Sequence, residues 1–257
     1  MGFLLFAHPE SRGDVLRGWC RHPCAKTTTS WICRTTSTTG PYIGTDSAYY
    51  KLNVTIYNDN QSWMVPRGCH GRSHTGGTHL DSPVHFYMGG WDATQIPLDR
   101  LLFLPMAIVD VREQVAMNAE YLLSVDDILS WEERNGPLPS GCLFVTNTGQ
   151  SKHWPNRSAY MGIDGNGVKH FPAIQPEAAS FLATQRNVYG VGVDTPSIDA
   201  AHDDAAHRAV SAANIFILEN LVGLEKLPPR GARAIVLPLK MDGASGSPVR
   251  VVALAPL

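Results

Sequence analysis

The sequence predicts a layered α/β domain that is built on a mixed sheet. Patterns typical of helices and of strands alternate along the 257 residues, and apolar runs that fit buried strands outnumber the helices. Hydrophobic residues make up 44% of the chain and charged residues 17%, which is the balance of a globular protein and not of a disordered one. A chain of this length can enclose one sizeable core.

The amino-terminal part of the chain follows this pattern poorly. It contains the polar runs 27–29 and 35–39, which consist almost wholly of threonine and have no apolar period. We therefore divide the chain into a poorly patterned segment, 1–45, and one folded domain, 46–257.

Short apolar segments account for the predicted strands. The segment 50–56 alternates apolar and polar residues, as a strand with one buried face does. The run 102–111 is almost wholly apolar, which fits a strand that is buried on both faces. Further strand segments follow at 142–146, 188–193, 215–218, 234–239 and 249–253.

Helices are predicted between these strands, at 125–134, 175–184 and 205–212. Ser124 is the expected N-cap of the first helix, and the apolar face of that helix is expected to consist of Ile128, Leu129 and Trp131. Pro176 suits the first turn of the second helix, where its missing N–H costs nothing.

Charge and hydropathy restrict the partners of the protein. The formal net charge of −2 gives no electrostatic case for binding nucleic acid or an anionic membrane surface. No apolar run approaches the roughly 18 residues that a membrane span needs. The apolar run 2–7 is too short for the core of a signal peptide and no basic residue precedes it, which favours a cytoplasmic location.

The segment 74–86 gathers three histidines and a carboxylate. On an extended strand His79 and Asp81 lie two residues apart and point to the same side. Imidazole and carboxylate together suit a divalent cation such as zinc or manganese. His85 follows after a proline, and it could reach the same cavity as a base without binding the metal.

The same segment resembles the signature of the metal-dependent cyclase family, H-x-G-T-H-x-D-x-P-x-H. That family includes the bacterial-type kynurenine formamidases and the isatin hydrolases. An ordered series of matching blocks extends the resemblance over about 74–257 and makes it specific: 89–91, 95–98, 148–152, 170–172, 192–199, 219–221 and 246–250. The resemblance implies the swivelling β/β/α architecture of the family, and it implies a homodimer.

The chain departs from the family signature at one position. The family has a metal-binding histidine four residues before the position of His79, where this chain has Thr75. His74 lies one place earlier, and adjacent residues on a strand face opposite ways. Either a bulge at Gly76 and Gly77 brings His74 to the metal, or one ligand is missing.

His207 and Glu219 form the second pair of candidate ligands. Glu219 ends a buried apolar strand, and a buried carboxylate needs a cation or a histidine as partner. A structural histidine–carboxylate pair would satisfy the same requirement, but the family spaces its second pair of metal ligands in the same way. Asp194 and Asp199 flank a Pro-Ser turn, where they could position the loop before His207 or make only Asx-type turn bonds.

The resemblance also implies the chemistry. Its catalytic histidine corresponds to His85, which would take a proton from metal-activated water and return it to the leaving group. Phe86 and Trp91 could line an aromatic substrate pocket, although aromatic side chains more often belong to the core. The chain has no G-x-S-x-G sequence, which disfavours serine chemistry.

We therefore expect a hydrolase that uses one or two zinc or manganese ions to cleave a small amide, either an N-formyl aromatic amine or a cyclic amide. The alternative, which Thr75 and the unusual amino terminus favour, is a non-enzymatic ligand-binding protein on the same scaffold.

Overall fold

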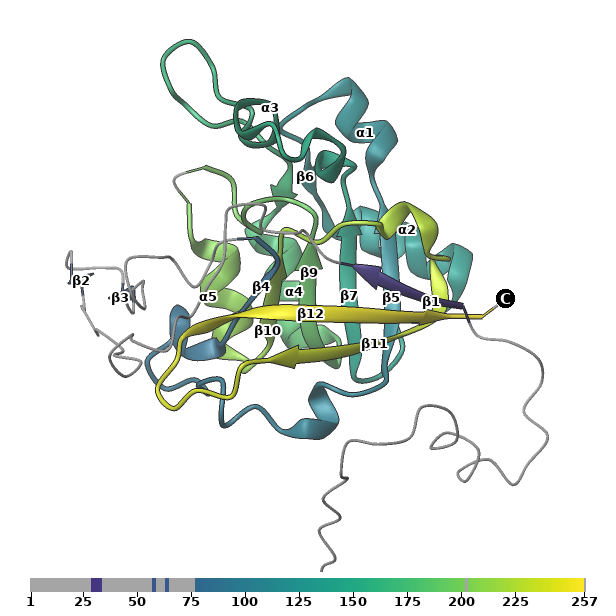
Figure 1. Cartoon of the computed structure of the whole chain (residues 1–257). Helices are drawn as coiled ribbons and strands as arrows, with labels where there is room; N and C mark the ends of the chain where they lie inside the picture. Colours follow the sequence, from purple (N-terminus) through teal and green to yellow (C-terminus); the bar gives the residue numbers. More distant parts are fainter. Residues whose placement is uncertain (1–28, 34–56, 59–62, 65–76, 202, 257) are drawn as a thin grey trace, which may run out of the picture.

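A computed structural model of the chain describes residues 29–33, 57–58, 63–64, 77–201 and 203–256. One large sheet forms the centre of the described chain (Figure 1). Its strands follow the order β1 (Thr29–Cys33), β12 (Gly246–Ala255), β11 (Arg230–Pro238), β5 (Leu104–Asp110), β7 (Cys142–Asn147), β9 (Val188–Val193), β10 (Phe216–Glu219) and β4 (His79–Asp81). Because β4 pairs with β12 as well as with β10, the sheet closes on itself.

The sheet is mixed, as the sequence predicts. Strands β5, β7, β9 and β10 run parallel to one another, whereas β11, β12 and β4 join through antiparallel pairings. Met106 and Ile108 of β5 belong to one hydrophobic core, and Ala107 and Val109, which alternate with them, belong to another. Burial on both sides explains why this strand is almost wholly apolar.

One side of the sheet is covered by the helices α2 (Val125–Asn135), α4 (Pro176–Gln185) and α5 (Ala205–Ala212) (Figure 1). Ile128 and Trp131 of α2 contribute to the core beneath them. Ser124 caps α2 through a capping box, in which its hydroxyl accepts from the backbone N–H of Asp127 and the Asp127 carboxylate accepts from the N–H of Ser124.

Short elements complete the described chain. Two-residue strands form the pairs β2 (Tyr57–Asn58) with β3 (Trp63–Met64) and β6 (Leu122–Leu123) with β8 (Ala173–Ile174). The short helices are α1 (Arg112–Met117) and α3 (Arg157–Met161), and the 3₁₀ turns are η1 (Pro83–His85), η2 (Leu98–Arg100), η3 (Gln150–His153) and η4 (Leu224–Lys226).

The helices and the strands that the sequence predicts after residue 100 are present, with small shifts at their ends. The prediction for Leu129 is wrong: its side chain is 43% exposed, because one residue step turns it about 100° away from Ile128 toward solvent. The predicted strand 50–56 lies outside the described residues. Strand β1 falls within 1–45, where the sequence predicts no strand, and it pairs with β12.

None of the helices in the described part of the chain is long and apolar enough to cross a membrane.

Candidate metal centre

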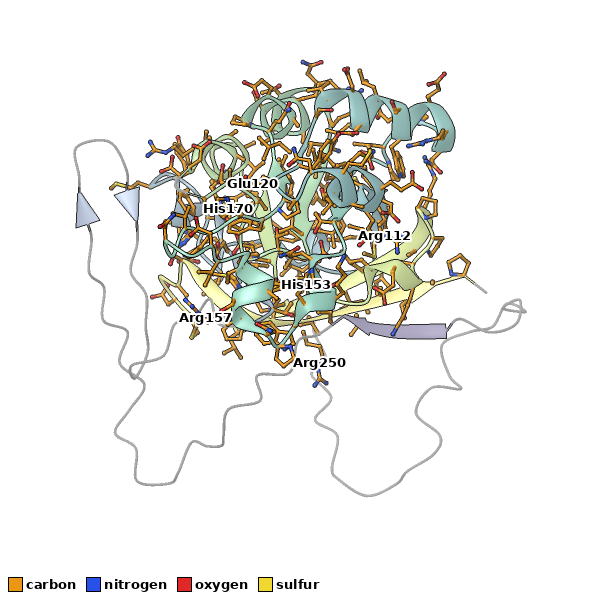
Figure 2. The ribbon with its side chains drawn as sticks, turned by 90° about the horizontal axis from the view of Figure 1, so that it is seen from above. Arg112, Glu120, His153, Arg157, His170 and Arg250 are labelled. Carbon is orange, nitrogen blue, oxygen red and sulfur yellow. The ribbon has the colours of Figure 1, made fainter. Side chains whose placement is uncertain are left out.

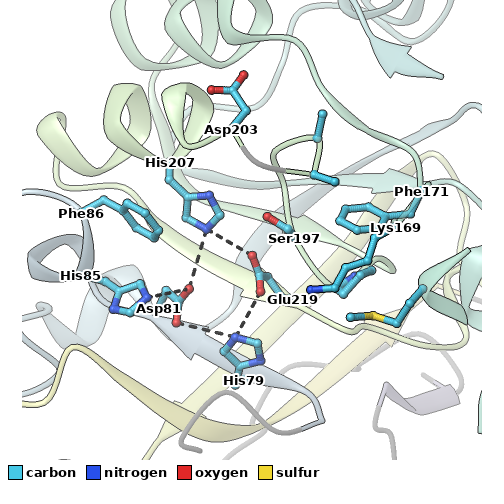
Figure 3. A pocket seen from close by; sticks show the side chains of 14 residues that line it. His79, Asp81, His85, Phe86, Lys169, Phe171, Ser197, Asp203, His207 and Glu219 are labelled. Atoms are coloured by element: carbon cyan, nitrogen blue, oxygen red, sulfur yellow. Dashed lines mark ion pairs between the residues drawn. The ribbon is translucent and has the colours of Figure 1, made fainter. Parts of the chain in front are cut away.

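A cavity of about 310 Å³ lies where β4, β10 and α5 meet (Figure 3). Five acidic or histidine side chains stand together in its wall, and apolar side chains surround them. The described residues that line it are His79, Asp81, His85, Phe86, Met161, Lys169, Phe171, Pro196, Ser197, Ala200, Ala201, Asp203, His207 and Glu219.

Strand β4 places His79 and Asp81 on the same side of the sheet, and both side chains are buried. The strand is only three residues long, but it pairs with both β10 and β12, and these two pairings fix its position. His79 Nδ1 lies 2.9 Å from the carbonyl oxygen of Gly77. When Nδ1 donates to that carbonyl, Nε2 keeps its lone pair and faces the cavity.

A tight turn after β4 brings His85 back to the cavity. Pro83 starts the 3₁₀ turn η1, where its fixed φ suits the first position. Gly90 packs against this turn so closely that a Cβ there would lie 2.7 Å from the carbonyl carbon of Pro83. The turn sets His85 Nε2 at 3.9 Å from Asp81 Oδ2.

The first turn of α5 positions His207. The Asp199 carboxylate accepts hydrogen bonds from the backbone N–H groups of Ala206 and His207. It also bonds Nδ1 of the His207 ring, so Nε2 of that ring is directed into the cavity. A carboxylate behind a histidine in this manner fixes the ring orientation and makes its free nitrogen more basic.

Glu219 lies between the two histidines. It ends β10, whose pairing register places it opposite His79. One carboxylate oxygen lies 3.2 Å from His79 Nε2 and the other 3.1 Å from His207 Nε2. Asp81 completes the group, with its oxygens at 3.6 Å from His79 Nε2 and 3.8 Å from His207 Nε2.

Several polar atoms of this cluster are buried without a hydrogen-bond partner in the described part of the chain. They are His79 Nε2, Asp81 Oδ1, His207 Nε2 and Glu219 Oε1. Unsatisfied buried polar atoms are costly, and here they converge on one place. His79, Asp81 and Glu219 each offer a ligand atom within 4.8 Å of the others, and nitrogen and carboxylate donors suit a divalent cation. These residues fit a metal ion.

The charges of the cluster are strongly coupled. Burial opposes protonation of His79, but Asp81 and Glu219 outweigh burial and raise the pKa of His79 to about 9. The same neighbours and Asp199 raise the pKa of His207 well above its ordinary value against the effect of burial. His85 differs, because burial dominates and lowers its pKa, which keeps its imidazole neutral.

Two further residues lie at the site, and neither was among the predicted site residues. Asn220 has a left-handed backbone, with φ of 57°, and its amide donates to the carbonyl of Gly77 over 3.0 Å. Lys169 lines the cavity. Asn220 could have been noticed because it follows Glu219 in a family block, whereas Lys169 stands in a polar loop with no pattern that marks it.

The structure brings most of the predicted site residues together. His79, Asp81, His85, His207 and Glu219 line one cavity. Asp199 reaches His207 directly, whereas Asp194 binds Thr148 and Ser151 in another loop. His74 and Thr75 lie outside the described residues.

The two aromatic predictions have different outcomes. Phe86 lines the cavity, and its ring centroid lies 4.2 Å from that of His207. Trp91 does not line it, so its predicted place in a substrate pocket is corrected. Its ring packs against the core on the other side of the sheet, beneath the Arg100 guanidinium at 4.8 Å.

Comparisons with known proteins identify the family of this chain. The sequence profile described as putative cyclase matches residues 22–200. An isatin hydrolase of Roseibium aggregatum is 32% identical over 206 residues, which cover 76% of this chain and 74% of that protein. A kynurenine formamidase of Salinibacter ruber is 32% identical over 185 residues, which cover 70% of this chain and 75% of that protein.

Solved structures show the same fold. The structure of isatin hydrolase A from Ralstonia solanacearum superposes with a TM-score of 0.72 at 28% identity, covering 89% of this chain and 92% of that one. An isatin hydrolase bound to the product analogue thioisatinate superposes with a TM-score of 0.71 at 26% identity, covering 90% of this chain and 93% of that one. The sequence and the fold together show that this chain belongs to the cyclase family.

Proposed function

We propose that this protein is a metal-dependent hydrolase that cleaves the carbon–nitrogen bond of a small aromatic amide. The observation that carries the proposal is the convergence of four buried polar atoms that make no hydrogen bond in the described part of the chain, beside a neutral histidine and inside a cavity. The hydrolase names of the similar proteins support it.

His79, Asp81, His207 and Glu219 would hold the metal. A bound divalent ion supplies a Lewis acid that lowers the pKa of water and polarises a carbonyl. The chain prepares its ligands in advance, because Gly77 and Asp199 orient the two imidazoles with their Nε2 atoms toward the carboxylates. Zinc and manganese both suit such donors.

His85 would move the proton. Burial lowers its pKa, so the neutral imidazole can accept a proton from the attacking water. Its position 3.9 Å from Asp81 stabilises the imidazolium that forms, and the same proton can then pass to the departing nitrogen.

Apolar residues of the cavity would hold the substrate. Phe86 stands beside His85 and His207, and Phe171 lies across the cavity from it (Figure 3). A flat aryl ring fits between such side chains. An N-formyl aromatic amine or a cyclic aromatic amide combines this ring with the bond to be cleaved.

Hydrolysis assays with defined metal content test the proposal. Protein purified and loaded with Zn²⁺ or Mn²⁺ should hydrolyse formanilide or isatin, which can be followed by absorbance, and a chelator should abolish the activity until metal is restored. Stoichiometric metal without turnover of any aryl amide would instead support a non-enzymatic ligand-binding protein. The homodimer stays a prediction, which sedimentation equilibrium can test.

A further inference from the structure

Lys169 brings a positive charge to the cavity. It is the only lysine or arginine among the described residues that line it. Figure 3 shows its side chain extending toward Glu219 with the amino group directed into the cavity. No carboxylate in the described part of the chain forms an ion pair with it.

The loop that carries Lys169 is firmly built. Gly162 begins it with a left-handed φ of 58°, and a Cβ there would lie 1.8 Å from the carbonyl oxygen of His170. Asp164 accepts a hydrogen bond from the backbone N–H of Val168 over 2.8 Å. The His170 ring lies 2.9 Å from a carboxylate oxygen of Glu120, and Figure 2 shows the two side chains next to each other. The backbone on both sides of Lys169 is therefore anchored.

The other charged residue at the mouth of the cavity does not neutralise Lys169. One oxygen of Asp203 accepts from the backbone N–H groups of Asp204 and Ala205, so this carboxylate is turned to its own loop. A divalent ion would balance the two carboxylates of the cluster. The charge that remains directed into the cavity is then the ammonium group of Lys169.

We propose that Lys169 determines substrate specificity by binding a carboxylate that is carried by the aryl substrate or by the product formed from it. This inference rests on the proposed hydrolase function and adds the class of substrate. Phe171 and Met161 line the same cavity and offer apolar contact to the ring. A carboxylate can come from two sources: the substrate carries it, or opening of a cyclic amide creates it in the product.

A matched pair of substrates tests the first source. Formanilide and 2-formamidobenzoate share the same scissile bond, and only the second has a ring carboxylate. We expect Lys169→Met to raise KM about tenfold for 2-formamidobenzoate, to leave formanilide within about twofold, and to keep the metal content unchanged. Lys169→Arg should retain most of the preference. Lys240→Met, which removes an exposed lysine away from the cavity, is the matched control.

The ring-opened product of isatin tests the second source. If the carboxylate arises in the product, Lys169→Met should weaken product inhibition about tenfold and leave KM for isatin unchanged. A carboxylate-dependent effect in either experiment supports the proposal. Equal effects on formanilide and 2-formamidobenzoate, or no effect on both KM and product inhibition, would overturn it.

A binding measurement separates this proposal from the proposed function. If the wild-type protein hydrolyses none of the amides, the proposed function fails, but 2-aminobenzoate and aniline can still be titrated into metal-loaded protein by calorimetry. If the wild-type protein binds 2-aminobenzoate more tightly than aniline and Lys169→Met removes this difference, the result supports the role of Lys169. The same affinity in both proteins rules it out.

Discussion

His79 and His207 approach the same two carboxylates from opposite sides, but the chain holds them in different ways. A backbone carbonyl, that of Gly77, orients His79, and the residue itself lies on a strand between two others. A side chain, that of Asp199, orients His207 on the first turn of α5. No side-chain substitution removes the Gly77 carbonyl itself, whereas one substitution removes the Asp199 carboxylate. Two candidate ligands with similar contacts to the carboxylates should therefore differ in their sensitivity to mutation.

Removal of a carboxylate should affect both histidines and therefore have the largest effect. Asp81 contacts His79, His85 and His207. We expect Asp81→Ala to abolish stoichiometric metal binding and to lower kcat/KM by at least ~10³-fold, because the metal and its activated water are lost together.

Metal analysis of the purified variant and an amide hydrolysis assay measure these two losses. Asp242→Ala, at an exposed position away from the cavity, is the control. Full metal content with normal turnover in Asp81→Ala would remove Asp81 from the site.

Substitution of His85 should separate rate from metal binding. We expect His85→Ala to keep its metal and to lose ~10² to 10⁴-fold in kcat, which is the typical contribution of general acid–base catalysis. His153→Ala, which removes a histidine outside the cavity, should leave both quantities unchanged. Loss of metal together with rate would make His85 a ligand instead of a proton carrier.

Substitution of Asp199 tests the difference between the two histidines directly. We expect Asp199→Asn to lower metal affinity roughly 10 to 100-fold, because a carboxylate behind a ligating histidine is typically worth that much. Asp194→Asn is a matched control, since Asp194 is also a buried carboxylate but binds Thr148 and Ser151.

Both variants should lose thermal stability, but only Asp199→Asn should lose metal affinity in a competition titration. An equal loss of affinity in the two variants would mean that the effect comes from stability and not from the orientation of His207.

A change of pH should alter the stability of the protein less than these substitutions alter metal binding and activity. In metal-free protein the folded pKa of His79 is about 9 and its ordinary value is 6.5. Because the folded pKa is raised, protonated His79 stabilises the fold fully below pH 6.5. This contribution is lost as the pH rises through 9. Asp81 and Glu219, whose pKa values are lowered, stay ionised over this range.

In metal-loaded protein the metal should take the place of the proton on His79, so only the metal-free protein should lose this contribution. The difference in Tm between the two forms should therefore grow from pH 6.5 to pH 9. Differential scanning fluorimetry at fixed ionic strength measures it. A difference that shrinks or stays constant over this range would contradict the charge assignment of His79.

The local sequence pattern could predict that His79 and Asp81 share one side of a strand, but it could not predict the residues that meet or position them. The two-residue step from His79 to Asp81 places both on one side of any strand. The meeting of Glu219 with His79 depends on the register between β10 and β4, which only the folded sheet sets. The resemblance to a family supplied that pairing. Lys169 was not predicted as a site residue, because no pattern in its loop indicates that the loop lines the cavity.

For the fold as well, the sequence pattern predicts individual elements better than contacts between distant segments. Apolar runs such as 142–146 predicted the buried strands, because burial on both faces leaves little choice of residue. The helix at Val125–Asn135 was predicted correctly by its cap, but Leu129 was assigned to the wrong face. Closure of the sheet through β4 and β12 had no signal in the sequence, because it joins segments far apart in the chain.

Titration of metal-depleted protein with Zn²⁺ and Mn²⁺ by isothermal calorimetry, with Glu219→Gln as the comparison, tests the central claim most directly. We expect the wild-type protein to bind at least one ion per chain and to release protons on binding. Glu219→Gln, which alters the carboxylate between His79 and His207, should bind the ion more weakly. Wild-type protein that binds neither ion, or a variant that binds them as tightly, would contradict the assignment of this cluster as a metal centre.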